Sequence, residues 1–130
     1  MKQETLVQLL FSAKGRINRQ KFLFAFIGWG ALIMVMMVIS TIFTAMAMNP
    51  DASSFWSVMT GLFGIINVVL YIVMMYSSIA LQIKRWHDLD RSGWFTLLGF
   101  LPIVNLIYGV YVYCVKGTTG DNQFGKDPLA

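Results

Sequence analysis

The sequence QIKRWHDLDRSGW, residues Gln82–Trp94, separates two long uncharged stretches of the chain. Within it, the side chains that carry charge or can titrate are Lys84, Arg85, His87, Asp88, Asp90 and Arg91. Uncharged runs of more than twenty residues lie on both sides. Such a segment is typical of a loop between membrane-spanning helices, because charges are costly inside the hydrocarbon core of a bilayer.

The composition of the 130-residue chain is unlike that of a water-soluble globule. Hydrophobic residues make up 57% of the chain and charged residues 12%, whereas a soluble domain carries roughly 25% charged residues. The net charge of +4 lies in short segments between apolar runs, which favours membrane topology signals over nucleic-acid binding. Cys114 is the only cysteine, so no intramolecular disulfide is possible. The sequence predicts a membrane protein with no nucleic-acid partner.

Three apolar runs predict an all-α, polytopic membrane protein that forms one membrane domain, residues 1–130. The first run, 22–48, contains 27 residues and would extend about 40 Å as a helix, against a hydrocarbon core of about 30 Å. The second run, 58–83, contains 26 residues. The third, 94–115, contains 22 residues and is interrupted by Pro102. We expect three transmembrane helices, the third broken near this proline.

Polar segments flank the three runs. Residues 1–21 form a basic interfacial segment in which ETLVQLLF, Glu4–Phe11, is expected to lie as a short helix on the membrane surface. Asn18 is expected to cap the next helix. Residues 84–93 form a polar hinge, and residues 116–130 form a polar tail of turns. The first apolar run far exceeds the roughly 7–15 apolar residues of a signal peptide, so it is interpreted as an uncleaved span.

The distribution of cations predicts the orientation of the chain. The N-terminal segment and the hinge carry Lys and Arg residues, whereas the first loop carries Asp51 and no cation, so the N-terminus is predicted to be cytoplasmic. Pro102 allows either a kinked third span or a helical hairpin that dips into the bilayer and returns. Two arms of about 15 Å each would not reach the far side, which favours the kinked span. The charge rule favours the hairpin, which would put all ten cations inside. We take the kinked span as the expected form, and the side of the C-terminus stays open.

Three polar segments together resemble the pattern of a known family. FSAKGRINRQKF (Phe11–Phe22), KRWHDLDRSGW (Lys84–Trp94) and KGTTGDNQFGKDP (Lys116–Pro128) occur in this order, and they are similar to the domain-of-unknown-function family 805. The chain departs from the family pattern at Leu23 and Lys126, where tryptophan and proline are common. The resemblance implies a small, multi-span bacterial inner-membrane protein, and it supplies no catalytic residue and no cofactor.

The hinge offers weak support for metal binding or hydrolysis. His87, Asp88 and Asp90 are metal-ligand types, but adjacent helix positions point apart, and a zinc site needs three or four protein ligands. His87, Asp88 and Ser92 are the residue types of a catalytic triad, but no nucleophile elbow surrounds them. We expect no metal, no cofactor and no enzymatic activity, although His87 stays open as a general acid or base.

Two interpretations of the charged residues are stronger. The basic residues would gather at one membrane face and bind phosphate groups of anionic lipids. In the favoured alternative, Asp88 and Asp90 pair with arginines and lock the N-terminal segment against the hinge. If the second span continues as a helix through the hinge, residues 84, 87, 88 and 91 share one face. The predicted charged site comprises Arg16, Arg19, Lys21, Lys84, Arg85, His87, Asp88, Asp90 and Arg91.

These features predict a function that does not involve catalysis. We expect an integral, multi-pass inner-membrane protein that acts as a non-enzymatic accessory or interaction protein and contacts anionic lipid with a charged cluster on its cytoplasmic face. The alternative is a subunit of an oligomeric small transporter or channel, in which Asn67 and Asn105 would line a polar path. Asn67 is otherwise expected to face another helix. The expected partners are membrane lipids and either a second copy or another membrane protein.

Overall fold

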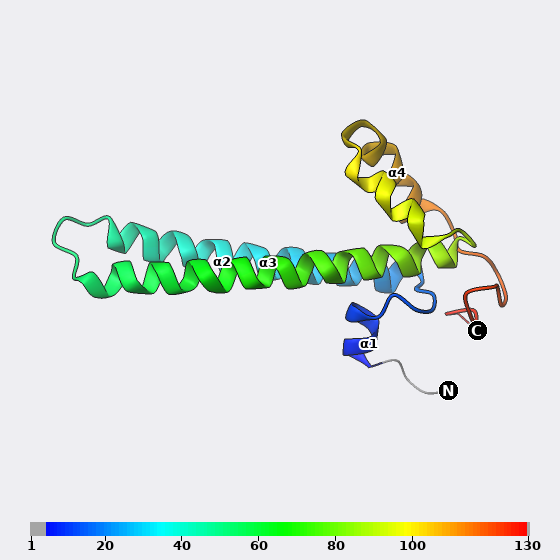
Figure 1. The fold of residues 1–130 in the computed structure, drawn as a ribbon, viewed down its shortest axis with the longest axis horizontal. Helices are drawn as coiled ribbons and strands as arrows, with labels where there is room; N and C mark the ends of the chain where they lie inside the picture. Colours follow the sequence, from blue (N-terminus) through cyan, green and yellow to red (C-terminus); the bar gives the residue numbers. More distant parts are fainter. Residues whose placement is uncertain (1–4, 130) are drawn as a thin grey trace. The chain divides into compact units, whose positions relative to one another are not determined.

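The computed structural model describes residues 5–129, and within them the chain is helical (Figure 1). The helices are α1 (Leu6–Phe11), α2 (Arg19–Ala47), α3 (Ser54–Asp88), the 3-10 helix η1 (Gly93–Phe100) and α4 (Pro102–Cys114). The predicted all-α class is confirmed. Helices α2 and α3 are long and apolar enough to cross a membrane, and α4 is a shorter apolar helix. The chain divides into two compact units: residues 27–75 form one, and the residues on either side of them form the other.

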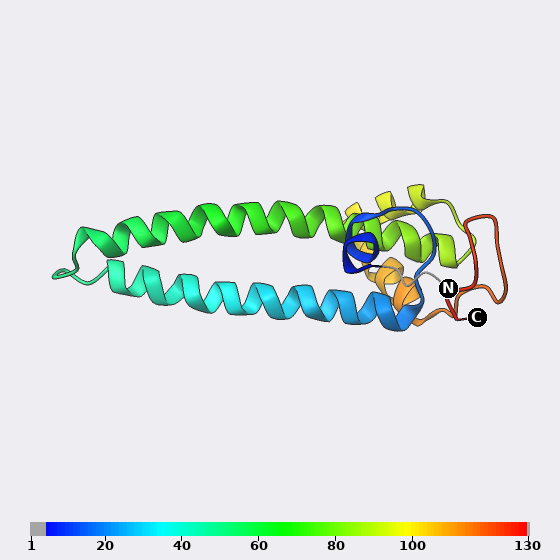
Figure 2. The same ribbon diagram turned by 90° about the horizontal axis from the view of Figure 1, so that it is seen from below.

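The unit of residues 27–75 contains most of α2 and the first two thirds of α3. The two helices run side by side along this unit in both views (Figures 1 and 2). The Asn67 amide Nδ2 donates to Ser40 Oγ at 2.9 Å and to the Phe63 carbonyl at 2.7 Å. The rings of Phe43 and Phe63 lie 4.5 Å apart. The prediction that Asn67 faces another helix is confirmed.

The surface of this unit is apolar. None of the side chains of residues 27–75 is buried, although most of them are hydrophobic. A helix that is hydrophobic all round lies either in the core of a large protein or in a membrane. Since these helices have no protein core to enter, their surface is suited to lipid.

The other unit holds all the buried side chains of the described residues. Its apolar core is small and contains Ile17, Phe22, Ala80, Leu81, Trp86, Leu89, Tyr108 and Val112. Trp86 Nε1 donates to Tyr108 Oη at 3.1 Å, and Tyr108 Oη donates to Gln82 Oε1 at 2.6 Å. The buried polar side chains are Arg16, Asn18, Ser77, Lys84, Arg85, Asp88 and Thr96. Charged side chains therefore lie in the interior of this unit. In an ordinary domain, charged side chains are almost never fully buried unless they are paired.

Helix ends follow capping residues rather than the edges of the uncharged runs. Helix α1 begins after a capping box, in which Thr5 and Gln8 satisfy each other's backbone N–H groups. Helix α2 begins at Arg19, and the Lys21 N–H donates to Asn18 Oδ1 at 2.9 Å. The predicted cap at Asn18 is confirmed. Because Asn18 lies outside the first apolar run, α2 begins three residues before the predicted span, and α3 begins four residues before its predicted span.

Helix α3 ends at Asp88, so it does not continue through the whole hinge. Asp90 has φ 56°, which is the left-handed conformation that Asp and Asn tolerate better than most residues. The Arg91 N–H donates to the Trp86 carbonyl at 2.9 Å, and the Asp90 N–H donates to the His87 carbonyl at 3.1 Å. This pair of bonds is a Schellman motif. It turns the chain at Asp90, and Arg91 therefore does not share a helix face with Asp88.

The third apolar run forms two short helices that pack against each other. Leu101 is extended between them, and Pro102 begins α4 at a position where its missing N–H costs nothing. Helix η1 starts just after the end of α3, and Arg85 Nε donates to the Val112 carbonyl in the last turns of α4 at 2.9 Å. Both ends of the run therefore lie beside the end of α3. The run is a returning hairpin, and the kinked span that we expected is not present.

Candidate functional site

The Asp88 carboxylate lies between two arginines that are far apart in the sequence. Oδ1 of Asp88 is 3.2 Å from Arg16 Nε and 3.1 Å from Arg16 Nη2, and Oδ2 accepts from Arg85 Nη1. All three residues are buried. Burying charges is favourable only where they are paired and their remaining donors are satisfied. We call Arg16, Arg85, Asp88 and Thr118 the Asp88 cluster.

The Arg16 guanidinium is held by the polar tail as well as by Asp88. Its Nη1 donates to the Gly120 carbonyl at 2.6 Å, and its Nη2 donates to the Thr118 carbonyl at 2.6 Å and to Thr118 Oγ1 at 3.0 Å. A longer bond runs from Nη1 to the Gly125 carbonyl at 3.4 Å. The tail therefore wraps around a side chain from the N-terminal segment.

The Arg85 guanidinium joins α3 to the hairpin. Its Nε donates to the Val112 carbonyl at 2.9 Å, and its Nη2 donates to the Val115 carbonyl. The last carbonyls of a helix have no partner within the helix, and cations near them are stabilising. Each nitrogen of Arg85 thus has a protein acceptor in this unit.

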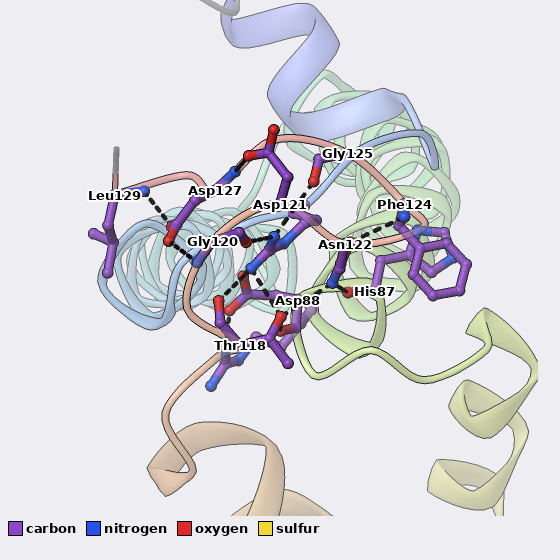
Figure 3. Close-up of polar contacts among 12 residues, drawn as sticks. His87, Asp88, Thr118, Gly120, Asp121, Asn122, Phe124, Gly125, Asp127 and Leu129 are labelled. Carbon is purple, nitrogen blue, oxygen red and sulfur yellow. Dashed lines mark hydrogen bonds and ion pairs between the residues drawn. The ribbon is translucent and has the colours of Figure 1, made fainter.

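The polar tail also caps the C-terminal end of α3 (Figure 3). The backbone N–H and the hydroxyl of Thr118 donate to the Asp88 carbonyl at 2.8 and 3.0 Å, and Asn122 Nδ2 donates to the His87 carbonyl at 2.8 Å. Gly117 precedes this contact, and a Cβ atom placed on it would lie 1.9 Å from Asp88 Oδ2. Only glycine fits where the tail passes the carboxylate.

His87 connects the N-terminal segment to the tail. Its Nδ1 lies 3.1 Å from the Gly15 carbonyl, so Nδ1 must carry the proton of this hydrogen bond. Its ring is parallel to that of Phe124, with the centroids 4.0 Å apart. No group of three or more metal-ligating side chains lies together in residues 5–129. In this structure His87 has a packing role.

Lys84 holds α1. Its Nζ donates to the Gln8 carbonyl at 2.7 Å and to the Leu9 carbonyl at 3.2 Å, and the side chain is fully buried. Asp88 pairs with Arg85, three residues before it in the same helix.

The structure separates the nine predicted site residues into two groups. Arg16, Lys84, Arg85 and Asp88 are buried together, with His87 half-buried beside them. Arg19, Lys21, Asp90 and Arg91 are exposed. The expected pairing of Asp90 with an arginine is wrong, because the turn at the end of α3 puts Asp90 at the surface, where it accepts from Gln123 Nε2 at 3.3 Å.

The family of the chain follows from a comparison over most of its length. Residues 10–126, which contain the first two polar segments and all but the last two residues of the third, match the model of the family described as "Protein of unknown function (DUF805)". The chain belongs to this family.

Two curated relatives are inner membrane proteins of Escherichia coli strain K12. The chain is 37% identical to "Inner membrane protein YhaH" over 65 residues, which are 50% of this chain and 54% of that protein. It is 39% identical to "Inner membrane protein YhaI" over 61 residues, which are 46% of this chain and 52% of that protein. The match thus spans about half the length of these relatives. No solved structure matches the chain.

The sequence did not reveal which tail residues of this DUF805 protein hold the cluster. Thr118 and Asn122 act through side chains, and their polarity in a glycine-rich segment was the available signal. Gly120 and Gly125 act through carbonyl oxygens, which every residue has. For those contacts the sequence carries no signal.

Asp127 fixes the loop of the tail that holds Arg16. Its Oδ2 accepts from the Gly120 N–H at 2.7 Å, and its Oδ1 accepts from the Leu129 N–H at 2.9 Å. These two hydrogen bonds hold the pKa of Asp127 below its usual value. The carboxylate form of Asp127 therefore stabilises the tail in the conformation that binds Arg16.

Proposed function

We propose that this protein is a non-enzymatic inner-membrane protein in which the Asp88 cluster holds the three polar segments together at the cytoplasmic face. Its exposed cations contact the headgroups of anionic lipids. One observation supports the proposal most strongly: every side-chain nitrogen of the buried Arg16 and Arg85 donates a hydrogen bond to a protein oxygen. These two side chains therefore have a structural role, and lipid contacts are left to the exposed cations.

Location in the inner membrane is supported by the helices and by the relatives. Helices α2 and α3 are each long enough to cross a hydrocarbon core of about 30 Å. Their side chains between residues 27 and 75 form no buried core. YhaH and YhaI are named inner membrane proteins. A multi-pass inner-membrane protein is consistent with all three observations.

The orientation follows from the charges and from the hairpin. The positive-inside rule favours a cytoplasmic N-terminal segment, because its Lys and Arg residues contrast with a first loop that carries only Asp51. The hairpin of η1 and α4 returns to α3, and the tail binds Asp88 and Arg16. The tail therefore lies on the same side as the N-terminal segment. We propose that both are cytoplasmic.

A non-enzymatic role is supported by how fully the polar side chains are engaged. Both carboxylate oxygens of Asp88 accept from arginine, and His87 is stacked on Phe124 with Nδ1 bonded to a carbonyl. A general acid or base needs access to the proton that it moves. In this cluster the side chains support one another instead of facing a substrate.

Contact with anionic lipid is assigned to the exposed cations Arg19, Lys21 and Arg91. Each basic residue near an anionic membrane surface contributes about 1 kcal/mol to the attraction. Replacing all three with glutamine removes three charges without touching a buried contact.

Thermal stability of the purified protein in detergent, with added lipid, tests the proposal. Phosphatidylglycerol should raise the Tm of the wild type, and phosphatidylcholine should not. The Arg19→Gln/Lys21→Gln/Arg91→Gln variant should lose most of this response, while Asp90→Asn, an exposed change that removes a negative charge, should keep it. An equal response of the wild type to both lipids would refute the lipid contact.

A further inference from the structure

A small polar pocket opens between the start of α2 and the tail, in the same unit as the Asp88 cluster. Its volume is about 120 Å³, and it is lined by Arg19 and Gln20 of α2, by Asp88, and by Lys116, Thr119 and Asp127 near the end of the chain. In water this volume would hold about four molecules. A phosphate group fits a pocket of this volume.

The pocket wall carries two cations, Arg19 and Lys116, and two acids, Asp88 and Asp127, and the positive charge is in excess once Arg16 and Arg85, which pair with Asp88, are counted. Neither Arg19 nor Lys116 forms an ion pair with any residue of the described range 5–129. Asp88 is paired with two arginines, whereas Asp127 accepts from two backbone N–H groups and keeps a negative charge that attracts Lys116. Arg19 also lies close enough to Arg85 for their charges to repel. An anion in the pocket would pair with Arg19 and Lys116 and relieve this repulsion.

The first turn of α2 lines the same pocket. Asn18 accepts from the N–H groups of Lys21 and Phe22, through its side chain and its carbonyl respectively. The N–H groups of Arg19 and Gln20 have no acceptor among the described residues. They belong to the first turn of a 29-residue helix, where unpaired N–H groups favour a negative charge.

We infer that this pocket binds a single phosphate group, which Arg19 and Lys116 hold by charge and the first turn of α2 holds by hydrogen bonds. The inference rests on the proposed function and narrows it to one site. The phosphate belongs either to an anionic lipid headgroup or to free phosphate. Arginine suits this ligand because its planar fork can donate two parallel hydrogen bonds to phosphate oxygens.

Two double variants with the same change in charge test the site. Arg19→Gln/Lys116→Gln removes both cations of the pocket, and Lys21→Gln/Arg91→Gln removes two exposed cations outside it. The full-length protein in detergent is titrated with phosphatidic acid, with phosphatidylcholine and with inorganic phosphate, and the Tm is followed. Neither pair makes an ion pair in the described chain, so the Tm without ligand should be unchanged. The single variant Lys116→Gln gives a second reading if the pocket pair loses stability.

If the pocket binds phosphate, the two double variants should lose unequal amounts of lipid affinity. Phosphatidic acid should raise the Tm of the wild type with saturation, and the pocket pair should need at least tenfold more lipid than the outside pair. A matching loss on titration with inorganic phosphate would identify free phosphate as a ligand of the same pocket, whereas a response to phosphatidic acid alone would identify the lipid.

Two results would overturn the inference, and they differ in what they say of the proposed function. If both pairs lose the response equally, the lipid is attracted by charge alone, so the pocket fails while the proposed lipid contact stands. If the wild type responds to neither phosphatidic acid nor inorganic phosphate, the pocket and the lipid contact fail together.

Discussion

At the level of single residues, the close contact between Gly117 and Asp88 leaves no space for a larger side chain at position 117. A Cβ atom at this position would lie 1.9 Å from Asp88 Oδ2 and 2.5 Å from its Cγ. Since the carboxylate is fixed by two arginines, it cannot move aside without breaking an ion pair. Gly117→Ala should therefore destabilise the protein by at least the roughly 1–3 kcal/mol typical of overpacking.

The loss can be measured as the free energy of unfolding in detergent. Gly109→Ala is the matched control, because nothing lies within 4 Å of a Cβ atom at that position and alanine is a better helix former than glycine. The account predicts a large loss for position 117 and none for position 109. Equal stabilities of the two variants would contradict the close approach of the tail.

Asp88→Asn should be the most damaging change among the charged residues. It leaves the guanidiniums of Arg16 and Arg85 buried without a countercharge, and breaking a buried pair in this way costs about 3–5 kcal/mol. Asp90→Asn, an exposed change two residues away, should alter stability by no more than about 0.5 kcal/mol. Chemical denaturation of both variants compares them, and similar losses would show that the cluster is not what stabilises the unit.

The sequence predicted some of these residues and missed others for physical reasons. Asp88 with Arg16 and Arg85 was one of the expected pairings, because acids interleaved with bases need partners. By the same reasoning Asp90 was expected to pair with an arginine. It differs from Asp88 in its left-handed backbone conformation at the end of α3. Local backbone conformation of this kind depends on how the helix ends, which charge patterning does not reveal.

At the level of elements, the tail acts as the cap of α3. It has no periodicity, so the sequence predicted turns and nothing more. Its conformation comes from long-range hydrogen bonds, such as those of Thr118 to Asp88 and Asn122 to the His87 carbonyl. The long helices were predictable because their apolar runs and their caps are local signals, whereas the docking of the tail is not local.

The tail should respond to pH through Asp127. Its pKa is lowered in the folded protein by hydrogen bonds from Leu129 and Gly120, so its carboxylate contributes stability above the unfolded-state pKa of about 3.9. This contribution is lost as the pH falls from there through the lower pKa of the folded state. The Tm difference between wild type and Asp127→Asn should be constant above about pH 5 and shrink on further acidification. A difference that grows in acid would contradict this role.

At the level of the whole molecule, the direction of the third apolar run decides how the polar segments are arranged. Geometry from the sequence favoured a kinked span, and the distribution of cations favoured a returning hairpin. The structure has the hairpin, because Pro102 begins a new helix after an extended Leu101 and Arg85 binds the carbonyls at the end of α4. The choice could not be made from the sequence, since the acceptors of Arg85 are backbone atoms.

The central claim is that one charged cluster joins the N-terminal segment, the end of α3 and the tail on a single side of the membrane. Reporter domains that are active only in the cytoplasm or only in the periplasm, fused in turn to the N-terminus and to the C-terminus of the full chain, test it directly. The account predicts that the cytoplasmic reporter is active and the periplasmic reporter silent at both termini. Reporters that place the two termini on opposite sides would contradict it, because Thr118 and Arg16 would then lie on opposite sides of the membrane.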